Sequence, residues 1–346
     1  MIDGEVPSAR LTDIVEGYFL GPGSSTPAGE TFAGLKAEWE PRGVAFHASV
    51  SSVAPPAAGE QKIVLISGRT ADNPRLLREV IDQGCTCVYL EKPGAPSVPE
   101  LEEMAAYAKS KGVPVFMGYN KNVTQYVTEA LTAEADAGSG ASTAFYHNNA
   151  YRPEELGECF ERNSEGMLKN MAIHELALLV TYYGVRGDNI AQIVPDKEYS
   201  SCQTLAGPSG KAFTDFDKIG FTVTTTEGKS VSVFADRCGD MGGGGYSEAI
   251  VTKNGAEIFR SLTPDDALKA VVAQKQAVNP DWMPYFILQH DDYITLKDRV
   301  CRARLTGTSP QGVATIEIGI ETLKVAEFLT PTLAAQLSSG AVQSKL

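Results

Sequence analysis

The sequence predicts an α/β protein, with a doubly wound parallel sheet in its first part and mainly β-structure in its second half. Between Lys62 and Asn120, continuous apolar runs alternate with amphipathic helical segments, which is the pattern of a parallel sheet with helical crossovers. From Ile190 to about Ile320, short strand-like segments follow one another with turn residues between them. The length of 346 residues favours two domains of about 150 residues each.

Composition and charge narrow the class of protein. Hydrophobic residues make up 43% and charged residues 21%, as in ordinary soluble chains. No apolar run reaches the roughly 18 residues of a membrane-spanning helix, so we expect no membrane partner. The N-terminus lacks the features of a secretory signal, so we expect a cytoplasmic protein. The net charge of -13 argues against nucleic acid as a partner and leaves a small-molecule ligand open.

Cysteine, histidine and glycine patterns give no metal or phosphate motif. The six cysteines contain no Cys-x-x-Cys pair, so we expect reduced, mostly buried thiols. His47, His147 and His290 show no ligand spacing, and we expect no metal site. The glycine run 242–245 lies between β segments, which favours a flexible hairpin over a phosphate loop.

The first sixty residues can form a βαβ unit. Thr26 as N-cap and Pro27 at the first helical position predict a helix over 28–40, between strands at 14–20 and 44–50. The turn before this helix contains the two glycines that open a dinucleotide fingerprint, but the third glycine is absent. An ordinary Pro/Gly loop is the alternative interpretation. The residues concerned are Gly21 and Gly23.

Small polar residues follow the second of these strands. An acid usually grips the ribose hydroxyls of a dinucleotide there, whereas this chain has Ser49, Ser51 and Ser52. Serines tolerate a 2'-phosphate, so the sequence slightly favours NADP over NAD.

The segment from Lys62 onward predicts the regular part of the sheet. Helix signals are Asn73 as N-cap before Pro74, and a capping box from Ser97 to Glu100. The expected strands are 63–66, 85–90 and 113–117. Parallel strands present ligand-binding residues at their carboxyl ends. That edge carries Ser67, Gly68, Glu91, Lys92, Tyr119 and Asn120.

The second half predicts a polar loop and one long buried helix before the β-rich part. The loop 149–163 carries Tyr151 and Arg152, which either grip a substrate or form a solvated pair. The helix 165–183 is apolar on nearly all sides, and Asn170 and His174 share one of its faces. The other expected elements are a helix at 123–135, strands at 143–148, 220–226, 230–235, 247–252 and 256–259, and a final helix at 316–329.

These features together resemble the Gfo/Idh/MocA family of nicotinamide-dependent oxidoreductases. The resemblance rests on the run 63–66, Glu91-Lys92-Pro93, Gly118-Tyr119-Asn120, and the later helix with Asn170 and His174. It implies a Rossmann-like doubly wound parallel sheet, followed by an α+β domain with a large, mostly antiparallel open sheet. The expected boundaries are a nucleotide-binding domain at 1–122, divergent over 1–60, a substrate and oligomerisation domain at 123–333, and a mobile tail at 334–346.

The resemblance also implies residue roles. Lys92 lies beside the nicotinamide and the reacting hydroxyl, His174 acts as general base, and Asn170 orients it. Cofactor contacts are expected from Gly21, Gly23, Ser67, Gly68, Glu91, Lys92 and Asn120, and substrate contacts from Tyr119, Tyr151 and Arg152.

Two departures from the family pattern keep alternatives open. Asn170 stands where the family has Asp, which makes His174 a weaker base. The glycine fingerprint is incomplete, so either the first half of the Rossmann unit is reduced or the start lies upstream of Met1. A buried structural role for His174 is also open.

The expected function is hydride transfer between NAD or NADP and a sugar, polyol or related alcohol or carbonyl compound, by a homodimer or homotetramer. The alternative is an inactive member that binds a nucleotide or sugar as a sensor or regulator. Redox-cofactor-dependent glycoside cleavage is a further alternative.

Overall fold

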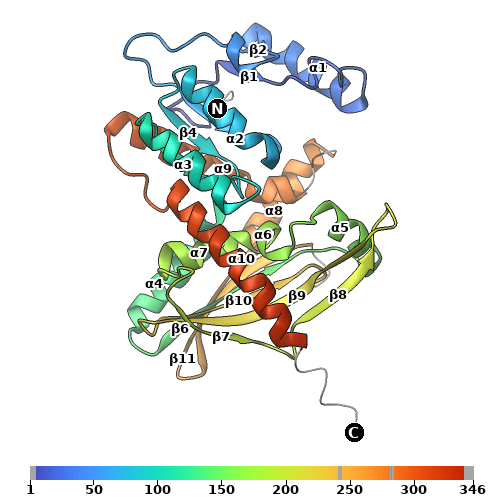
Figure 1. Cartoon of the computed structure of the whole chain (residues 1–346), viewed down its shortest axis with the longest axis vertical. Coiled ribbons are helices and arrows are strands. Elements are labelled where there is room, and N and C mark those ends of the chain that lie inside the picture. The colour runs from blue at the N-terminus through green and yellow to red at the C-terminus, as the bar shows by residue number, and fades with distance from the viewer. Residues whose placement is uncertain (1–4, 241–243, 281, 283, 339–346) are drawn as a thin grey trace. The chain divides into compact units, whose positions relative to one another are not determined.

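The computed structural model describes residues 5–240, 244–280, 282 and 284–338, and the chain divides into two compact units. The first unit joins the residues up to Gly118 with Ile294–Ile316, and the second joins Tyr119–Tyr293 with the residues from Glu317 onward. Neither unit is one continuous stretch of sequence, because the helix α9 (Pro284–Thr306) contributes residues to both (Figure 1).

Parallel strands form the first unit, as the sequence predicts. β1 (Asp13–Val15) pairs with β2 (Ala45–His47), and α1 (Pro27–Trp39) connects them. A second parallel sheet has the order β3 (Ile63–Ile66), β4 (Cys87–Leu90), β5 (Val115–Met117), with α2 (Asn73–Asp82) and α3 (Val98–Ser110) between its strands. The predicted α/β alternation is therefore confirmed.

The expected single doubly wound sheet is divided into two sheets in this unit. β1 and β2 form a two-stranded sheet of their own, and among the described residues β3 pairs only with β4. β3 is consequently an edge strand, and its Ile63, Val64 and Leu65 are only half-buried, whereas the four residues of β4 are almost fully buried. A continuous apolar run is usual for a strand with neighbours on both sides, so the sequence suggested a more central place for β3.

Two of the three predicted helix N-caps are confirmed. The Thr26 hydroxyl accepts a hydrogen bond from the Gly29 amide at 3.1 Å, and Ser97 caps α3 as predicted. Asn73 is not an N-cap. It is the first residue of α2, and its side-chain amide donates to the Gly94 carbonyl at 3.0 Å.

The second unit is built on a seven-stranded sheet with the order β12-β11-β6-β10-β9-β7, where β8 also pairs with β9. The β6–β10 pair is parallel and the other pairs are antiparallel. The strands are β6 (Ala141–Asn148), β7 (Ile190–Pro195), β8 (Ser201–Ala206), β9 (Ala212–Thr225), β10 (Ser230–Asp236), β11 (Tyr246–Lys253) and β12 (Ala256–Thr263). This sheet confirms the predicted mostly antiparallel second domain.

Helices cover one face of this sheet. α4 (Gln125–Ala137), α6 (Met167–Asn170), α7 (Ile173–Tyr182) and α10 (Ile316–Ser338) contribute buried side chains to one apolar core with β6, β9, β10 and β11 (Figure 1). Burial alternates residue by residue along β10 and β11, because successive side chains of a strand point to opposite faces.

Four secondary-structure expectations are wrong in this part of the chain. The predicted helix 165–183 is two helices, because Ala172 has a ψ of 2° and interrupts it between α6 and α7. The loop 149–163 contains α5 (Leu156–Arg162). The region 190–320 contains the helices α8 (Asp266–Val278) and α9 as well as strands. Residues 334–338 of the predicted tail belong to α10, and the rest of the tail lies outside the described residues.

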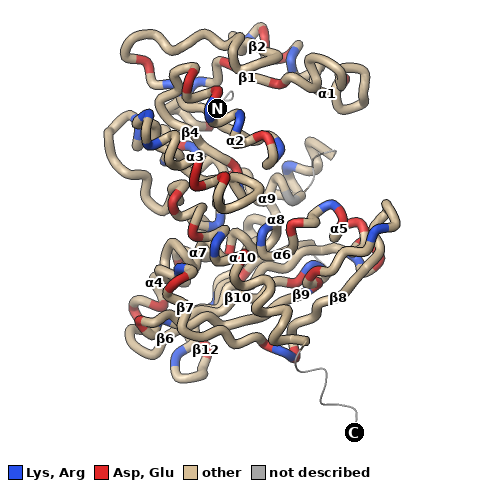
Figure 2. Tube along the Cα trace, in the orientation of Figure 1, with Lys and Arg blue, Asp and Glu red and all other residues tan. Residues whose placement is uncertain are grey.

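Surface charge is mostly balanced locally. Lys and Arg are interspersed with Asp and Glu along the trace (Figure 2), and several form pairs one helical turn apart, such as Arg75–Glu79 at 2.7 Å. Exposed pairs of this kind contribute at most about 1 kcal/mol each. All six cysteines are free, and none of the described helices is long and apolar enough to cross a membrane. Residues 241–243 of the predicted glycine hairpin lie outside the described residues.

Candidate active site

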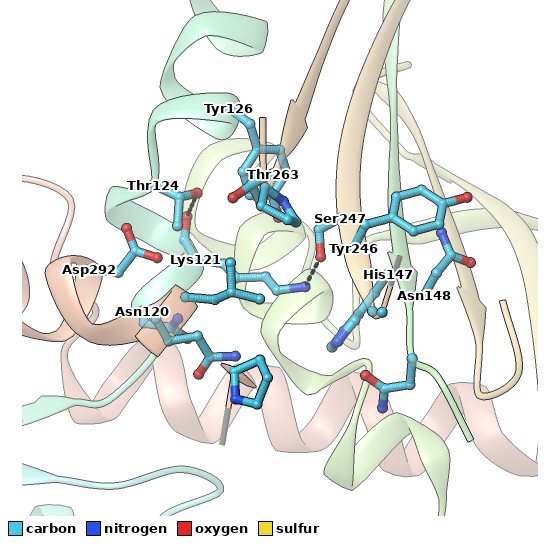
Figure 3. Close-up of a pocket in the computed structure, with 17 residues that line it drawn as sticks. Asn120, Lys121, Thr124, Tyr126, His147, Asn148, Tyr246, Ser247, Thr263 and Asp292 are labelled. Carbon is cyan, nitrogen blue, oxygen red and sulfur yellow. Dashed lines mark hydrogen bonds between the residues drawn. The ribbon is translucent and has the colours of Figure 1, made fainter. Parts of the chain in front are cut away.

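A cavity of about 140 Å³ with several polar side chains in its lining lies in the second unit (Figure 3). Its walls come from the 3₁₀ turn η4 (Asn120–Val123), the start of α4, the end of β6, the start of β11 and the first turns of α9. Lys121, His147, Ser247 and Asp292 are among the lining residues, and these side chains can bind or transfer protons.

A buried ion-pair network forms one wall of this cavity. The Lys121 Nζ donates to the Glu175 Oε1 and, at 2.8 Å, to the Ser247 hydroxyl. The His147 Nδ1 lies 3.0 Å from the other carboxylate oxygen of Glu175. Glu175 is fully buried on α7, where an ionised carboxylate is tolerated only with close partners of opposite charge. These contacts supply those partners, and they hold the Lys121 ammonium in a fixed place.

The pKa values in this network follow from burial and charge. Burial alone would raise the pKa of Glu175, but His147 and then Lys121 outweigh it and hold that pKa well below its ordinary value. Burial lowers the pKa of Lys121, and Glu175 opposes that effect. At neutral pH Glu175 is therefore a carboxylate whose two oxygens are both used inside the protein.

Asp292 lies on α9 at the other side of the cavity. Figure 3 shows it across Lys121 from His147 and Asn148. Burial, together with the neighbouring Asp291, raises the pKa of Asp292 to about 7, while Lys121 opposes the rise. Carboxyl groups with a pKa near neutrality are suited to proton transfer. The cavity thus combines a fixed ammonium with a carboxyl group that can take or release a proton.

The first unit gathers four of the predicted site residues at one sheet edge. Ser67 and Gly68 follow β3, and Glu91 and Lys92 follow β4, with the Glu91 amide donating to the Ile66 carbonyl at 2.9 Å. Ser67 and Gly68 are exposed, and Lys92 is half-buried. The Lys92–Pro93 peptide bond is cis.

Glu91 occupies space beside a glycine at this edge. A Cβ on Gly118 would lie 2.6 Å from the Glu91 Oε2. Burial raises the pKa of Glu91, and the positive charges of Lys297 and Lys92 oppose the rise. The bare backbone of Gly118 is therefore what admits the Glu91 carboxyl group at the end of β5.

The residues that were predicted to form a site with His174 are not gathered around it in the second unit. The His174 ring meets the Tyr119 ring edge-on at a centroid distance of 6.1 Å, and both side chains are buried. Of the described residues, Asn120 lines the cavity, whereas Tyr119 and His174 are not among its lining. Asn170 ends α6 and donates to Glu165 at 2.8 Å, so it does not share one continuous helix with His174. Lys92 belongs to the other unit, and its pairing with His174 stays a prediction.

Two predicted substrate contacts lie among surface pairs. Arg152 is bonded to Glu155 at 2.9 Å, and the Tyr151 hydroxyl accepts from Arg162 at 2.9 Å. Neither Tyr151 nor Arg152 is among the described residues that line the cavity. A substrate role for either one stays a prediction.

Internal hydrogen bonds occupy the backbone amides of the glycine turn before α1. The amides of Gly21 and Gly23 both donate to the Tyr18 carbonyl, at 3.1 and 2.8 Å, and the Glu16 carboxylate accepts from the Tyr18 amide at 2.8 Å. A Cβ on Gly23 would lie 2.3 Å from the Tyr18 ring. Close contact with this ring is therefore enough to require glycine at position 23. Phosphate binding by these two amides would require the bonds to Tyr18 to break.

Sequence reasoning missed the groups that form the cavity's charge network. Lys121, His147 and Ser247 come from separate elements, and no spacing connects them. One signal was present for Glu175, because an acid within a nearly all-apolar helix must be paired when the helix is buried.

Comparison with solved structures gives one consistent fold. The myo-inositol 2-dehydrogenase of Lactobacillus plantarum superposes with a TM-score of 0.65 at 14% identity, over 98% of this chain and 94% of that one. The scyllo-inositol dehydrogenase of Lactobacillus casei, solved with NAD(H) and scyllo-inositol, gives 0.64 at 11% identity, over 92% and 88%. The chain has the Gfo/Idh/MocA fold.

A further neighbour with this fold carries a nucleotide sugar. The WlbA dehydrogenase of Bordetella pertussis, in complex with NADH and UDP-GlcNAcA, gives a TM-score of 0.60 at 16% identity, over 94% of this chain and 90% of that one. A scan against protein-family models finds no match, and a search of curated proteins finds no significant one.

Two of the neighbours with this fold were solved with NAD(H) or NADH, and the first unit of this chain has one sheet edge with exposed residues at its strand ends. Ser67 and Gly68 present exposed backbone at the end of β3, next to Lys92 at the end of β4, as expected where strand ends bind a dinucleotide. The glycine turn has fewer hydrogen-bond donors for a dinucleotide, because the Gly21 and Gly23 amides already donate to the Tyr18 carbonyl. Cofactor contacts from Ser67, Gly68 and Lys92 stay a prediction.

Proposed function

We propose that this protein is an NAD(P)-dependent oxidoreductase that acts on a hydroxyl or carbonyl carbon of a small polyhydroxylated compound. The observation that carries the proposal is the set of hydrogen-bonding side chains that line the cavity of the second unit, in a chain with the Gfo/Idh/MocA fold. Asn120, Asn148 and Ser247 supply neutral hydrogen-bonding groups there, and Lys121 is already neutralised by Glu175. A lining of this kind favours a neutral polyol over a strongly anionic ligand.

The proposed reaction interconverts an alcohol and a carbonyl compound. The nicotinamide, when bound, supplies the two-electron acceptor or donor. Lys92 is proposed to stabilise the oxygen that becomes negative as its proton leaves, because an ammonium at that oxygen lowers the energy of the alkoxide. His174 is proposed to accept a proton, since imidazole is the side chain that most often serves as a general base.

The choice between NAD and NADP belongs to the same proposal. The hydroxyl of Ser49 is hydrogen-bonded to those of Ser51 and Ser52, at 3.0 and 2.9 Å, in the turn that follows β2. These exposed hydroxyl groups support a slight preference for NADP. The neighbours solved with a cofactor contain NAD(H) or NADH, which supports NAD.

Fluorescence titration of the purified protein with NADH and NADPH tests this proposal. We expect saturable binding of at least one of them at sub-millimolar concentration. Absence of binding of both at that concentration would refute the proposed function. A Lys92→Ala variant serves as a control for the position of the nicotinamide, because it should weaken binding without changing the far-UV circular dichroism.

A further inference from the structure

Ser247 contributes a hydroxyl group to the cavity wall, and the protein uses only part of its hydrogen-bonding capacity. Its oxygen accepts a hydrogen bond from the Lys121 Nζ at 2.8 Å (Figure 3). A hydroxyl oxygen that accepts one hydrogen bond still carries an O–H donor. No acceptor among the described residues is hydrogen-bonded to that donor. Ser247 is 6% exposed and lines the cavity, so a molecule bound there can supply the acceptor.

Tyr126 is the neighbouring residue that could take this hydrogen bond within the protein. Burial raises the pKa of Tyr126 and Ser247 opposes the rise, so the two hydroxyl groups lie close together. The Tyr126 oxygen nevertheless has no hydrogen-bond partner in the described part of the chain. Asn120 also lines the cavity, and its buried side-chain oxygen has no partner there either. Because buried polar atoms are normally hydrogen-bonded, these oxygens favour a ligand that brings donors as well as acceptors.

The ion pair behind Ser247 strengthens its O–H group as a donor. Lys121 also donates to Glu175, whose other carboxylate oxygen lies 3.0 Å from the His147 Nδ1. These contacts fix the ammonium group, and an ammonium N–H bonded to a hydroxyl oxygen polarises the O–H bond of that hydroxyl. Glu175 balances the charge of Lys121, so the pair adds no net charge to the wall. A neutral oxygen of a ligand is therefore a suitable acceptor for Ser247.

We propose that Ser247 is a ligand-binding residue, whose O–H group donates a hydrogen bond to a hydroxyl oxygen of the polyhydroxylated compound. Lys121 acts through Ser247, because it fixes and polarises that hydroxyl group. This inference rests on the proposed function and adds a specificity-determining residue to it. It concerns residues of the second unit only and includes no chemical step.

Calorimetry with myo-inositol and scyllo-inositol, without nicotinamide, tests the role of Ser247. The wild type should bind at least one of them, and Ser247→Ala should bind it at least about tenfold more weakly, as for the loss of a charge-assisted hydrogen bond. Ser247→Cys keeps a side chain of similar shape with only a weak donor, so it should show the same loss.

Ser142 on β6 provides a matched control in the same sheet. Its hydroxyl group lies 3.1 Å from that of Thr252, and Ser142 is not among the described residues that line the cavity. Ser142→Ala should therefore keep the wild-type affinity for the inositols within about twofold.

Ligand analogues distinguish a direct contact from an effect on the fold. Monodeoxy-inositols each lack one hydroxyl group. In the wild type, loss of the hydroxyl that Ser247 contacts should weaken binding about tenfold, whereas in Ser247→Ala the same loss should weaken it less than about twofold. Equal losses in the two proteins for every analogue would overturn the inference. Failure of both inositols to bind to the wild type, or wild-type affinity in Ser247→Ala, would also overturn it.

Two further measurements keep the outcomes separate. Circular dichroism checks that each variant is folded, and Ser247→Cys carries the test if Ser247→Ala does not fold. If neither NADH nor NADPH binds to the wild type, the proposed function fails, and the inositol calorimetry still decides the role of Ser247. If a cofactor binds and the Ser247 variants keep the wild-type affinity for the inositols, only the inference fails.

Discussion

The Lys121–Glu175 pair provides the sharpest stability prediction. Glu175 is fully buried and the Lys121 side chain is 8% exposed, so Glu175→Gln would leave a buried ammonium without its counter-ion. Loss of one member of such a pair costs about 3–5 kcal/mol. With a urea m-value of roughly 2 kcal/mol/M, the midpoint of unfolding should fall by about 2 M.

The same prediction has a defined pH dependence. The folded-state pKa of Glu175 is depressed below its ordinary value of 4.5, so its stabilising contribution is present above that pH and is lost as the pH falls. The difference in free energy of unfolding between wild type and Glu175→Gln should therefore be largest at neutral pH and shrink below pH 4.5.

Two further variants make the test specific. Glu158→Gln removes one member of an exposed pair with Arg162 at 3.5 Å, and it should cost at most about 1 kcal/mol. The double change Glu175→Gln with Lys121→Met removes both charges, and it should recover most of the loss because no unpaired charge stays buried. Urea unfolding followed by circular dichroism measures all three variants. A Glu175→Gln midpoint equal to that of Glu158→Gln would refute the reasoning.

The remaining predictions concern catalysis and the glycines of α1. Lys92→Ala and His174→Ala should each abolish hydride transfer while the circular dichroism spectrum stays that of the wild type; full activity in both would show that the proposed roles are wrong. Gly29→Ala should destabilise the protein by roughly 1–3 kcal/mol, since its Cβ would lie 2.2 Å from the Gly23 carbonyl oxygen. Gly34→Ala in the same helix has nothing within 4 Å and should stabilise by about 1 kcal/mol in thermal unfolding; equal effects would contradict the packing described for Gly29.

Strand and helix positions in the first unit could be predicted because their signals are local. Ile63–Ile66 is an uninterrupted apolar run, and Ser97 with Glu100 forms a capping box within four residues. Separation of β1–β2 from β3–β5 could not be predicted in this way, because strand pairing joins segments that are far apart along the chain.

The break between α6 and α7 could not be predicted from the sequence, because both helices are buried and mostly apolar. Ten of the 14 residues from Met167 to Val180 are apolar, so the periodicity that would indicate a change of helix axis is weak. Asn170 and His174 are four positions apart in sequence, and they would share a face only in one continuous helix. Asn170 ends α6 and His174 lies in α7.

The side chains of the cavity come from residues that are far apart in the sequence. The Lys121–Glu175 bond joins residues 54 positions apart, His147–Glu175 joins residues 28 apart, and Lys121–Ser247 joins residues 126 apart. Only the fold brings these side chains together. The rule for parallel strands singled out Asn120 as a cofactor contact after a strand end, and the structure has it lining this cavity, whereas the cofactor contact stays a prediction.

The most direct test of the proposed function is the formation of reduced nicotinamide, followed by fluorescence, when the protein is mixed with NAD or NADP and a panel of inositols and linear polyols. We expect turnover with at least one pair, and we expect Lys92→Ala to abolish it. Binding of the cofactor without reduction by any member of the panel would contradict it.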